Sequence, residues 1–161
     1  MPTQPDQEFL ELLHHPIKSR LFLLQKIPSA FFSGVRVLYA DENKAIVSIP
    51  YKWFSSNPFK STYFACLSMA AELSTGILAT IPIYKQEPAV SMLITKSEAS
   101  FLKKAKGLTT FVCEDGQAIR NAIKEAMSTG KTTSIASRSI GKDDAGNVVA
   151  EFIFTWSFKV K

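Results

Sequence analysis

The feature that most limits how this chain can fold is the apolar stretch from Tyr63 to Ile81, which carries one carboxylate, Glu72, almost at its midpoint. Such a stretch predicts a helix that is apolar on nearly all sides and therefore needs cover on nearly all sides. A charge within it is costly to bury unless it is paired or used. The same carboxylate adds roughly 2.5 to 3.5 kcal/mol against insertion into a membrane. We expect a buried core helix rather than a membrane span, and a use for Glu72.

Length and charge narrow the class of protein further. The 161 residues are enough for one domain with a full core. The net charge of +5 is spread over all segments, which favours anionic small ligands or solubility over nucleic-acid binding. Cys66 and Cys113 lie far apart in the sequence, in apolar runs, so we expect reduced thiols, which suit a cytoplasm. The first residues carry acids where a signal peptide needs a basic head, so we expect a cytoplasmic protein.

Hydrophobic periodicity predicts the elements around the apolar helix. Two short helices are expected over 6–15 and 16–28, as a cap on a larger body. The other predicted elements are a hairpin over 34–53, strands over 89–102, 105–114, 131–140 and 147–160, and an amphipathic helix over 116–130. Ser61 or Thr62 is the expected N-cap of the apolar helix, and Pro82 its end. This order predicts an α+β domain whose long antiparallel sheet curls round the apolar helix.

That order, with "NPFKSTYFACLSMAAELSTG" at its centre, resembles the hotdog fold, a six-stranded antiparallel sheet wrapped round a central helix. The resemblance covers residues 30–161 and leaves 1–29 as an N-terminal helical extension. It is strongest to a thioesterase-like group, mostly of unassigned activity, that is related to the phenylacetyl-CoA type of acyl-CoA thioesterase. Those enzymes have an Asn before the helix, a His-Gly-Gly six residues later, and an Asp or Glu nine residues after the His. Asn57, Tyr63-Phe64-Ala65 and Glu72 fall at these intervals.

The resemblance implies hydrolysis of an acyl-CoA or similar thioester, without a cofactor or metal. Glu72 would act as general base or nucleophile, Asn57 would orient the water or the carbonyl, and Ser91 would help to hold the water. The residues implied in substrate binding are Phe59, Tyr63, Phe64, Ala65 and Thr75. It also implies a homodimer or a dimer of dimers, with the ligand tunnel between subunits.

Each of these residues also has a structural interpretation. Glu72 can be a hydrogen-bonded structural carboxylate, Asn57 a turn residue before Pro58, and Thr75 a hydroxyl bonded to its own helix. Lys103, Lys104 and Lys106 can meet coenzyme A phosphates or can simply protect a sheet edge. His14 and His15 are adjacent and face different ways on a helix, so we expect no metal site.

Two alternatives stand beside the enzyme, and one departure from the enzymes favours the first of them. Tyr-Phe-Ala replaces His-Gly-Gly, so the glycine backbone that approaches the thioester carbonyl is missing. This favours a non-catalytic module of the same fold that binds acyl-CoA or a small apolar ligand. The other alternative is a cone-shaped α+β domain whose apolar pocket serves another ligand.

Overall fold

The apolar stretch forms the helix at the centre of the structure. In the computed structural model, which describes residues 4–161, this helix, α4, spans Phe64–Thr80 and ends in a short 3-10 turn, η2, over Ile81–Ile83. The segment Phe64–Ile83 is long and apolar enough to cross a membrane, but 67% of its most apolar window is buried inside the structure. It is therefore packed as a core helix.

The start of α4 differs from the sequence prediction. Tyr63 is the N-cap, and it makes no side-chain capping bond, so the expectation of Ser61 or Thr62 is wrong. Thr62 is instead tied to the loop that follows β3, because its backbone N–H donates to the Ala105 carbonyl at 2.8 Å. The helix therefore begins one residue later than its local sequence suggests.

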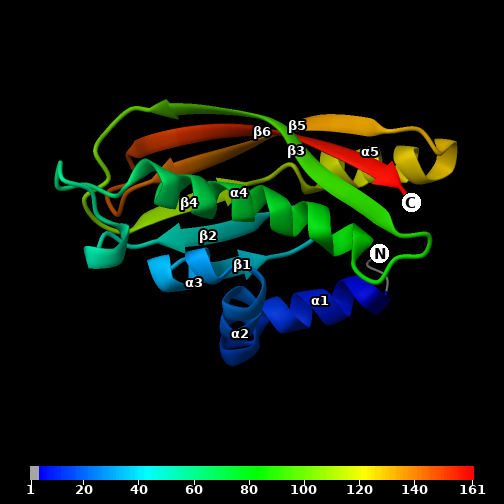
Figure 1. Cartoon of the computed structure of the whole chain (residues 1–161), viewed down its shortest axis with the longest axis horizontal. Coiled ribbons are helices and arrows are strands. Elements are labelled where there is room, and N and C mark those ends of the chain that lie inside the picture. The colour runs from blue at the N-terminus through cyan, green and yellow to red at the C-terminus, as the bar shows by residue number, and fades with distance from the viewer. Residues whose placement is uncertain (1–3) are drawn as a thin grey trace.

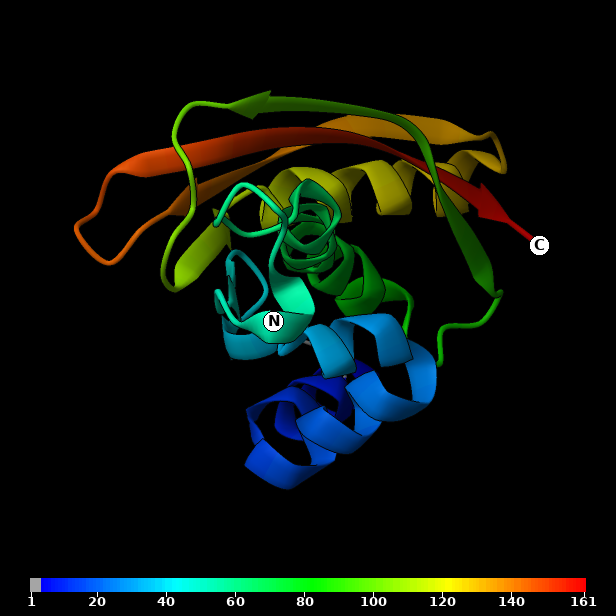
Figure 2. The same cartoon turned by 60° about the vertical axis from the view of Figure 1, so that its left-hand side comes forward.

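A single six-stranded antiparallel sheet curves over α4 (Figures 1 and 2). Its strands lie in the order β1-β2-β4-β5-β6-β3. Their bounds are Arg36–Ala40 (β1), Ala45–Ile49 (β2), Val90–Phe101 (β3), Thr109–Cys113 (β4), Thr133–Lys142 (β5) and Val148–Val160 (β6). The short β1 and the long β3 form the two edges. This is the hotdog arrangement, and it confirms the fold prediction.

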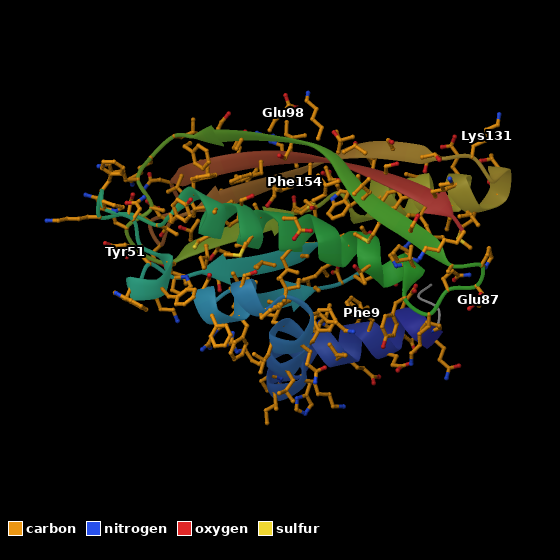
Figure 3. All side chains as sticks on the ribbon, viewed as in Figure 1. Phe9, Tyr51, Glu87, Glu98, Lys131 and Phe154 are labelled. Carbon is orange, nitrogen blue, oxygen red and sulfur yellow. The ribbon has the colours of Figure 1, made fainter. Side chains whose placement is uncertain are left out.

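The alternation along β6 explains why the sheet lies against α4. Phe152, Phe154, Trp156 and Phe158 are all at most 4% exposed, whereas the residues between them face outward. Figure 3 shows Phe154 on the inner side of the sheet and Glu98, on β3, pointing away from the body. Because side chains alternate along a strand, one face of β6 supplies the core and the other faces solvent.

Three helices precede the sheet. They are α1 (Gln4–His14), α2 (Pro16–Lys26) and α3 (Pro28–Ser33), of which the last was not predicted separately. His15 is the N-cap of α2, and its Nδ1 accepts a hydrogen bond from the Ile17 N–H at 3.2 Å. The Nε2 of His14 lies 2.7 Å from the Ala40 carbonyl. Both histidines thus connect and cap the N-terminal helices.

Two contacts anchor α1 to the rest of the molecule. Asp6 pairs with Arg120 of α5 (Gly116–Thr129) at 3.1 Å, and the two side chains are only 3% and 12% exposed. The ring of Phe9 stacks on Tyr84, with centroids 4.9 Å apart. Figure 3 shows Phe9 between α1 and α4. The N-terminal helices therefore share the core of the sheet domain and reach the middle of α4.

Candidate active site

Glu72, which is partly exposed, lines a small cavity between α4, the start of β3 and the N-terminal helices. The cavity has a volume of about 90 Å³, and apart from Glu72 and Thr80 its walls are apolar. They include Phe9 of α1, Phe22 of α2 and Met92 of β3. Among residues 4–161, no side chain or backbone group forms a hydrogen bond or ion pair with the Glu72 carboxylate. This differs from a structural carboxylate, which accepts hydrogen bonds.

Burial changes the acidity of this carboxyl group. Loss of hydration disfavours the charged form and raises the pKa of Glu72 from its ordinary 4.5 to about 7. A carboxyl group with a pKa near neutrality exchanges a proton readily under physiological conditions, which is what a general base requires. The cavity thus gives Glu72 a pKa suited to proton transfer, and its predicted role as general base or nucleophile stays a prediction.

Gly76 provides the space for the carboxylate. It lies one helical turn after Glu72, and a Cβ at Gly76 would come within 3.0 Å of Glu72 Oε1. Glycine inside a helix costs about 1 kcal/mol relative to alanine. Glycine at position 76 lowers helix stability but leaves room for the Glu72 carboxylate.

Thr75 has a different role from contact with the Glu72 carboxylate. Its Oγ1 donates to the backbone carbonyl of Glu72 at 2.9 Å and accepts from Trp156 Nε1 at 2.9 Å. The side chain is fully buried. Thr75 therefore joins α4 to β6 behind the cavity, and its predicted part in substrate binding stays a prediction.

A second and larger pocket lies at the N-terminal end of α4. Its volume is about 550 Å³, and the residues that line it come from the loop before α4, the start of α4 and the end of β3. Four of the predicted site residues line it, namely Asn57, Phe59, Tyr63 and Phe64. Sequence reasoning missed Phe101, whose ring lies 6.3 Å from that of Phe64, as well as Leu102.

Asn57 shapes the loop at the edge of this pocket. Its Oδ1 accepts from the Phe59 N–H at 2.9 Å, and its Nδ2 donates to Ser61 Oγ at 3.1 Å. The side chain closes a turn on its own backbone, as Asn often does. The structure thus gives Asn57 a definite structural role, and its catalytic role stays a prediction.

The first turn of α4 offers free hydrogen-bond donors to this pocket. Within residues 4–161, the N–H groups of Phe64 and Ala65 have no acceptor. Such groups carry the positive end of the helix dipole and can stabilise negative charge on a carbonyl oxygen. The Phe64 side chain is 56% exposed and lies beside them, against the Tyr63 ring at 5.0 Å.

Within one chain, the two pockets are separate. Glu72 lies eight residues after Phe64, which corresponds to about 12 Å along a helix. A water held by Glu72 cannot therefore attack a carbonyl bound at the start of the same α4.

Ser91 does not join Glu72 within the chain. Met92 faces the Glu72 cavity, and neighbouring residues of a strand face opposite sides. Ser91 is thus directed to the other side of the sheet, where its Oγ donates to the Lys159 carbonyl at 3.1 Å. Its role in holding water stays a prediction.

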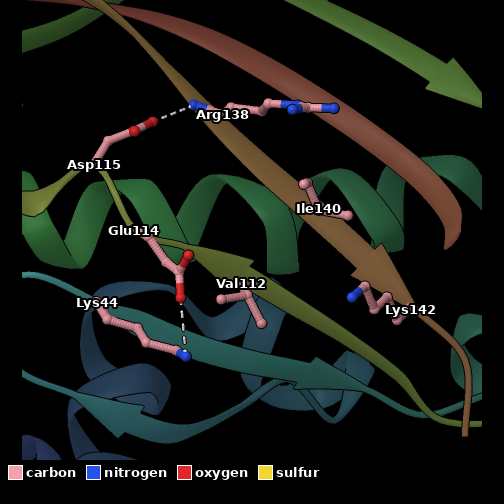
Figure 4. A pocket seen from close by; sticks show the side chains of 7 residues that line it. All are labelled: Lys44, Val112, Glu114, Asp115, Arg138, Ile140 and Lys142. Carbon is pink, nitrogen blue, oxygen red and sulfur yellow. Dashed lines mark hydrogen bonds and ion pairs between the residues drawn. The ribbon is translucent and has the colours of Figure 1, made fainter. Parts of the chain in front are cut away.

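A third pocket lies on the outer face of the sheet, where β4 and β5 diverge (Figure 4). Its charged groups largely satisfy one another. Glu114 pairs with Lys44 at 3.0 Å, and Asp115 accepts from the Arg138 N–H at 2.7 Å. None of the predicted site residues lines it, so we do not assign the reaction to this pocket.

Similar proteins agree with the fold at low sequence identity. No known protein family and no curated protein matches the sequence. A solved structure from Pseudomonas aeruginosa, of a protein of unknown function described as a probable thioesterase, has a TM-score of 0.77 and 22% identity over 91% of this chain and 97% of its own. A protein of unknown function from Chlorobaculum tepidum has a TM-score of 0.78 and 16% identity, covering 98% of this chain and 97% of its own. A thioesterase from Haemophilus influenzae has a TM-score of 0.61 and 12% identity, covering 87% and 88%.

These similarities establish the fold class. The chain has the hotdog fold. Because the Chlorobaculum match covers 98% of the chain, it includes most of the N-terminal helices as well as the sheet.

Proposed function

We propose that the protein is a thioesterase that hydrolyses an acyl-CoA or a similar thioester, with Glu72 as the general base. The single observation that carries this proposal is the Glu72 carboxyl group, which is buried in an apolar cavity without a partner among residues 4–161 and has a pKa raised to about 7. An unpartnered carboxyl group is expensive to bury, so a functional use explains it better than a structural one.

The proposed reaction needs only groups that the chain supplies. The Glu72 carboxylate takes a proton from water, and the water oxygen forms a bond to the thioester carbon. The N–H groups of Phe64 and Ala65 stabilise the negative charge that develops on the carbonyl oxygen. The carbon–sulfur bond then breaks, and the thiolate receives the proton from Glu72, which leaves a carboxylic acid and a free thiol.

This reaction requires a second copy of the chain, because Glu72 and the start of α4 are about 12 Å apart within one chain. β3 is an edge strand, and Leu93 and Phe101 on it are 66% and 50% exposed. A long exposed edge is normally covered by a partner strand. Antiparallel pairing of two β3 edges about a two-fold axis brings the N-terminal end of α4 in one subunit towards the middle of α4 in the other. We therefore propose a homodimer whose sites each combine Glu72 of one subunit with the Phe64 end of its partner.

The larger pocket suits an apolar acyl chain. Phe59, Tyr63 and Phe64 contribute aromatic surface, while Lys103 and Lys104 stand at the same pocket and can meet phosphates. Ligand pockets are mostly apolar with a few placed polar groups. Affinity for acyl-CoA should then rise with the length of the acyl chain.

We also propose a cytoplasmic location. The buried free thiols of Cys66 and Cys113 fit a reducing compartment.

One observation favours a non-catalytic module that binds acyl-CoA or a small apolar ligand. The Phe64 side chain stands beside the free N–H groups, where the enzymes with His-Gly-Gly have no side chain. A ring in this position can bind an acyl chain and at the same time keep its carbonyl away from the helix.

A thioesterase screen over acyl-CoA substrates of increasing chain length tests the proposal. Release of free coenzyme A by the wild type, lost in Glu72→Gln, supports the enzyme. Binding of the same acyl-CoA without turnover supports the binding module instead.

A further inference from the structure

One end of the molecule presents several large apolar side chains to solvent. Figure 1 shows η1 (Trp53–Ser55), the loop before α4 and the loop after β3 together at the left end. We call the following residues the aromatic end: Phe32, Trp53, Phe54, Phe59 and Leu102. Their exposed fractions run from 53% for Phe54 to 89% for Trp53. The only other tryptophan, Trp156, is 4% exposed.

The rings of this end form a connected surface. The Phe54 ring lies 6.3 Å from that of Phe32 and 6.1 Å from that of Trp53. η1 is joined to the start of α4, since the Tyr63 N–H donates to the Ser55 carbonyl at 2.7 Å. Phe59 and Leu102 both line the large pocket beside it. The aromatic end therefore borders the mouth of the proposed acyl site.

Positive charges outnumber negative ones around the aromatic end. Residues 43–71 and 99–113 contain no Asp or Glu and contribute five exposed lysines to this end: Lys52, Lys60, Lys103, Lys104 and Lys106. The carboxylates nearby come from the turn between β5 and β6: Asp143 pairs with Lys103 at 2.7 Å, and Asp144 lies beside Gly107. Within the described residues 4–161 the other four lysines form no ion pair. The surface thus combines exposed rings with an excess of positive charge.

We propose that the aromatic end docks on the surface of an anionic lipid bilayer. Tryptophan and phenylalanine rings are stable at the boundary between head groups and acyl chains. A ring as exposed as that of Trp53 would leave water on moving there, which is favourable. Lysines near an anionic membrane surface are attracted to its lipid head groups. A bound phosphate would use the lysines but would leave Trp53 and Phe54 in water, so a bilayer accounts for both sets of residues. Docking does not depend on the proposed hydrolysis, and it turns the mouth of the large pocket towards the lipid.

Vesicle sedimentation with the full chain tests this proposal. The wild type should sediment with vesicles of phosphatidylcholine plus phosphatidylglycerol, and at least 10-fold more weakly with phosphatidylcholine alone. Trp53 emission should shift to shorter wavelength and lose its quenching by iodide on the anionic vesicles only, and Trp53→Ala should abolish the shift. Unchanged emission on those vesicles would overturn the proposal.

Matched charge reversals separate a specific surface from general attraction. The triple variant Lys52→Glu, Lys60→Glu, Lys104→Glu should weaken vesicle binding at least 10-fold. The control is a second triple variant with the same change in net charge at exposed positions of α2 and α5, namely Lys18→Glu, Lys26→Glu, Lys124→Glu. It should weaken vesicle binding less than threefold. An equal loss in both variants would overturn the proposal. The proposal would also be overturned if Trp53 were protected from iodide quenching without vesicles and lost that protection on dilution. A second copy of the chain would then cover the aromatic end.

Discussion

The two pockets on α4 are built in opposite ways. The Glu72 cavity, at about 90 Å³, is small and is lined by Phe9 and Phe22 of the N-terminal helices. The pocket at the start of α4, at about 550 Å³, is large and is lined by exposed rings and lysines. A narrow apolar wall raises the pKa of a carboxyl group, whereas a large pocket has room for a ligand. Under the proposed function, the chain separates its general base from its binding surface, and a second copy of the chain would bring the two together.

The largest expected effect comes from removing the reactive group. Glu72→Gln keeps the shape of the side chain but removes the base, so thioester turnover should fall about 100-fold to 10,000-fold. Glu125→Gln is the control, since Glu125 is an exposed carboxylate on α5 and should leave turnover unchanged. Equal turnover in Glu72→Gln and wild type would remove Glu72 from the mechanism.

The same variant tests how the cavity affects stability. The pKa of Glu72 is raised in the folded state, so its contribution to stability is fully present below about pH 4.5 and is lost as the pH rises through about 7. Glu72→Gln does not lose this contribution, so above pH 7 its free energy of unfolding should exceed that of the wild type by up to roughly 3 kcal/mol. Thermal unfolding at pH 5 and pH 8 measures the difference. A lower melting temperature for Glu72→Gln at both pH values would indicate a structural carboxylate.

The second-largest effect concerns the open pocket. Phe64→Pro removes one free N–H at the first position of α4, where proline is tolerated, and Tyr63 before it already has the extended ψ of 134° that proline favours. Turnover should fall about 100-fold, as for the loss of one oxyanion donor. Phe64→Ala keeps the N–H and should retain turnover. If both variants lose activity equally, the Phe64 ring rather than its N–H matters for turnover, and the proposed oxyanion donor is rejected.

A smaller effect is expected at Gly76. Alanine is the better helix former by about 1 kcal/mol, but its Cβ would displace the Glu72 carboxylate from its position 3.0 Å away. We expect Gly76→Ala to keep or raise the melting temperature while turnover falls about tenfold. Turnover equal to that of the wild type would show that the position of the carboxylate is not critical.

The smallest expected effect comes from widening the Glu72 cavity. Phe22→Ala removes part of the wall on α2, admits water to Glu72 and lowers its pKa towards 4.5. The lower inflection in the pH profile of turnover should move from near 7 by about one unit to lower pH. Leu21→Ala, which truncates a side chain 49% exposed on the same helix, is the control. An unmoved inflection would mean that Phe22 does not set the acidity of Glu72.

The sequence predicts the fold well because its strongest patterns are local. The alternation through Phe152, Phe154 and Trp156 predicts β6 and its buried face, and the apolar run predicts α4. The order of these elements resembles the hotdog fold, and that fold is the one observed.

The walls of the candidate site were not predictable in the same way. Phe9 reaches Glu72 because long-range contacts, the Asp6–Arg120 pair and the Phe9–Tyr84 stack, anchor α1 across the molecule. Phe22 reaches it from α2, and no local pattern predicts either contact. The glycine four residues after Glu72 was the one local signal for the cavity, since glycine is unfavourable inside a helix. Thr62 failed as an N-cap for a similar reason, because the loop after β3 binds it.

Mixing two inactive variants tests the central claim most directly. Each proposed site combines Glu72 of one subunit with the Phe64 end of the other, so a Glu72→Gln and Phe64→Pro heterodimer contains one intact site. After subunit exchange in an equal mixture, about half the dimers are mixed, and thioester turnover should recover to roughly a quarter of the wild-type value. Turnover that stays at the level of the separate variants, in a mixture shown by mass spectrometry to contain the heterodimer, would contradict a site shared between two chains.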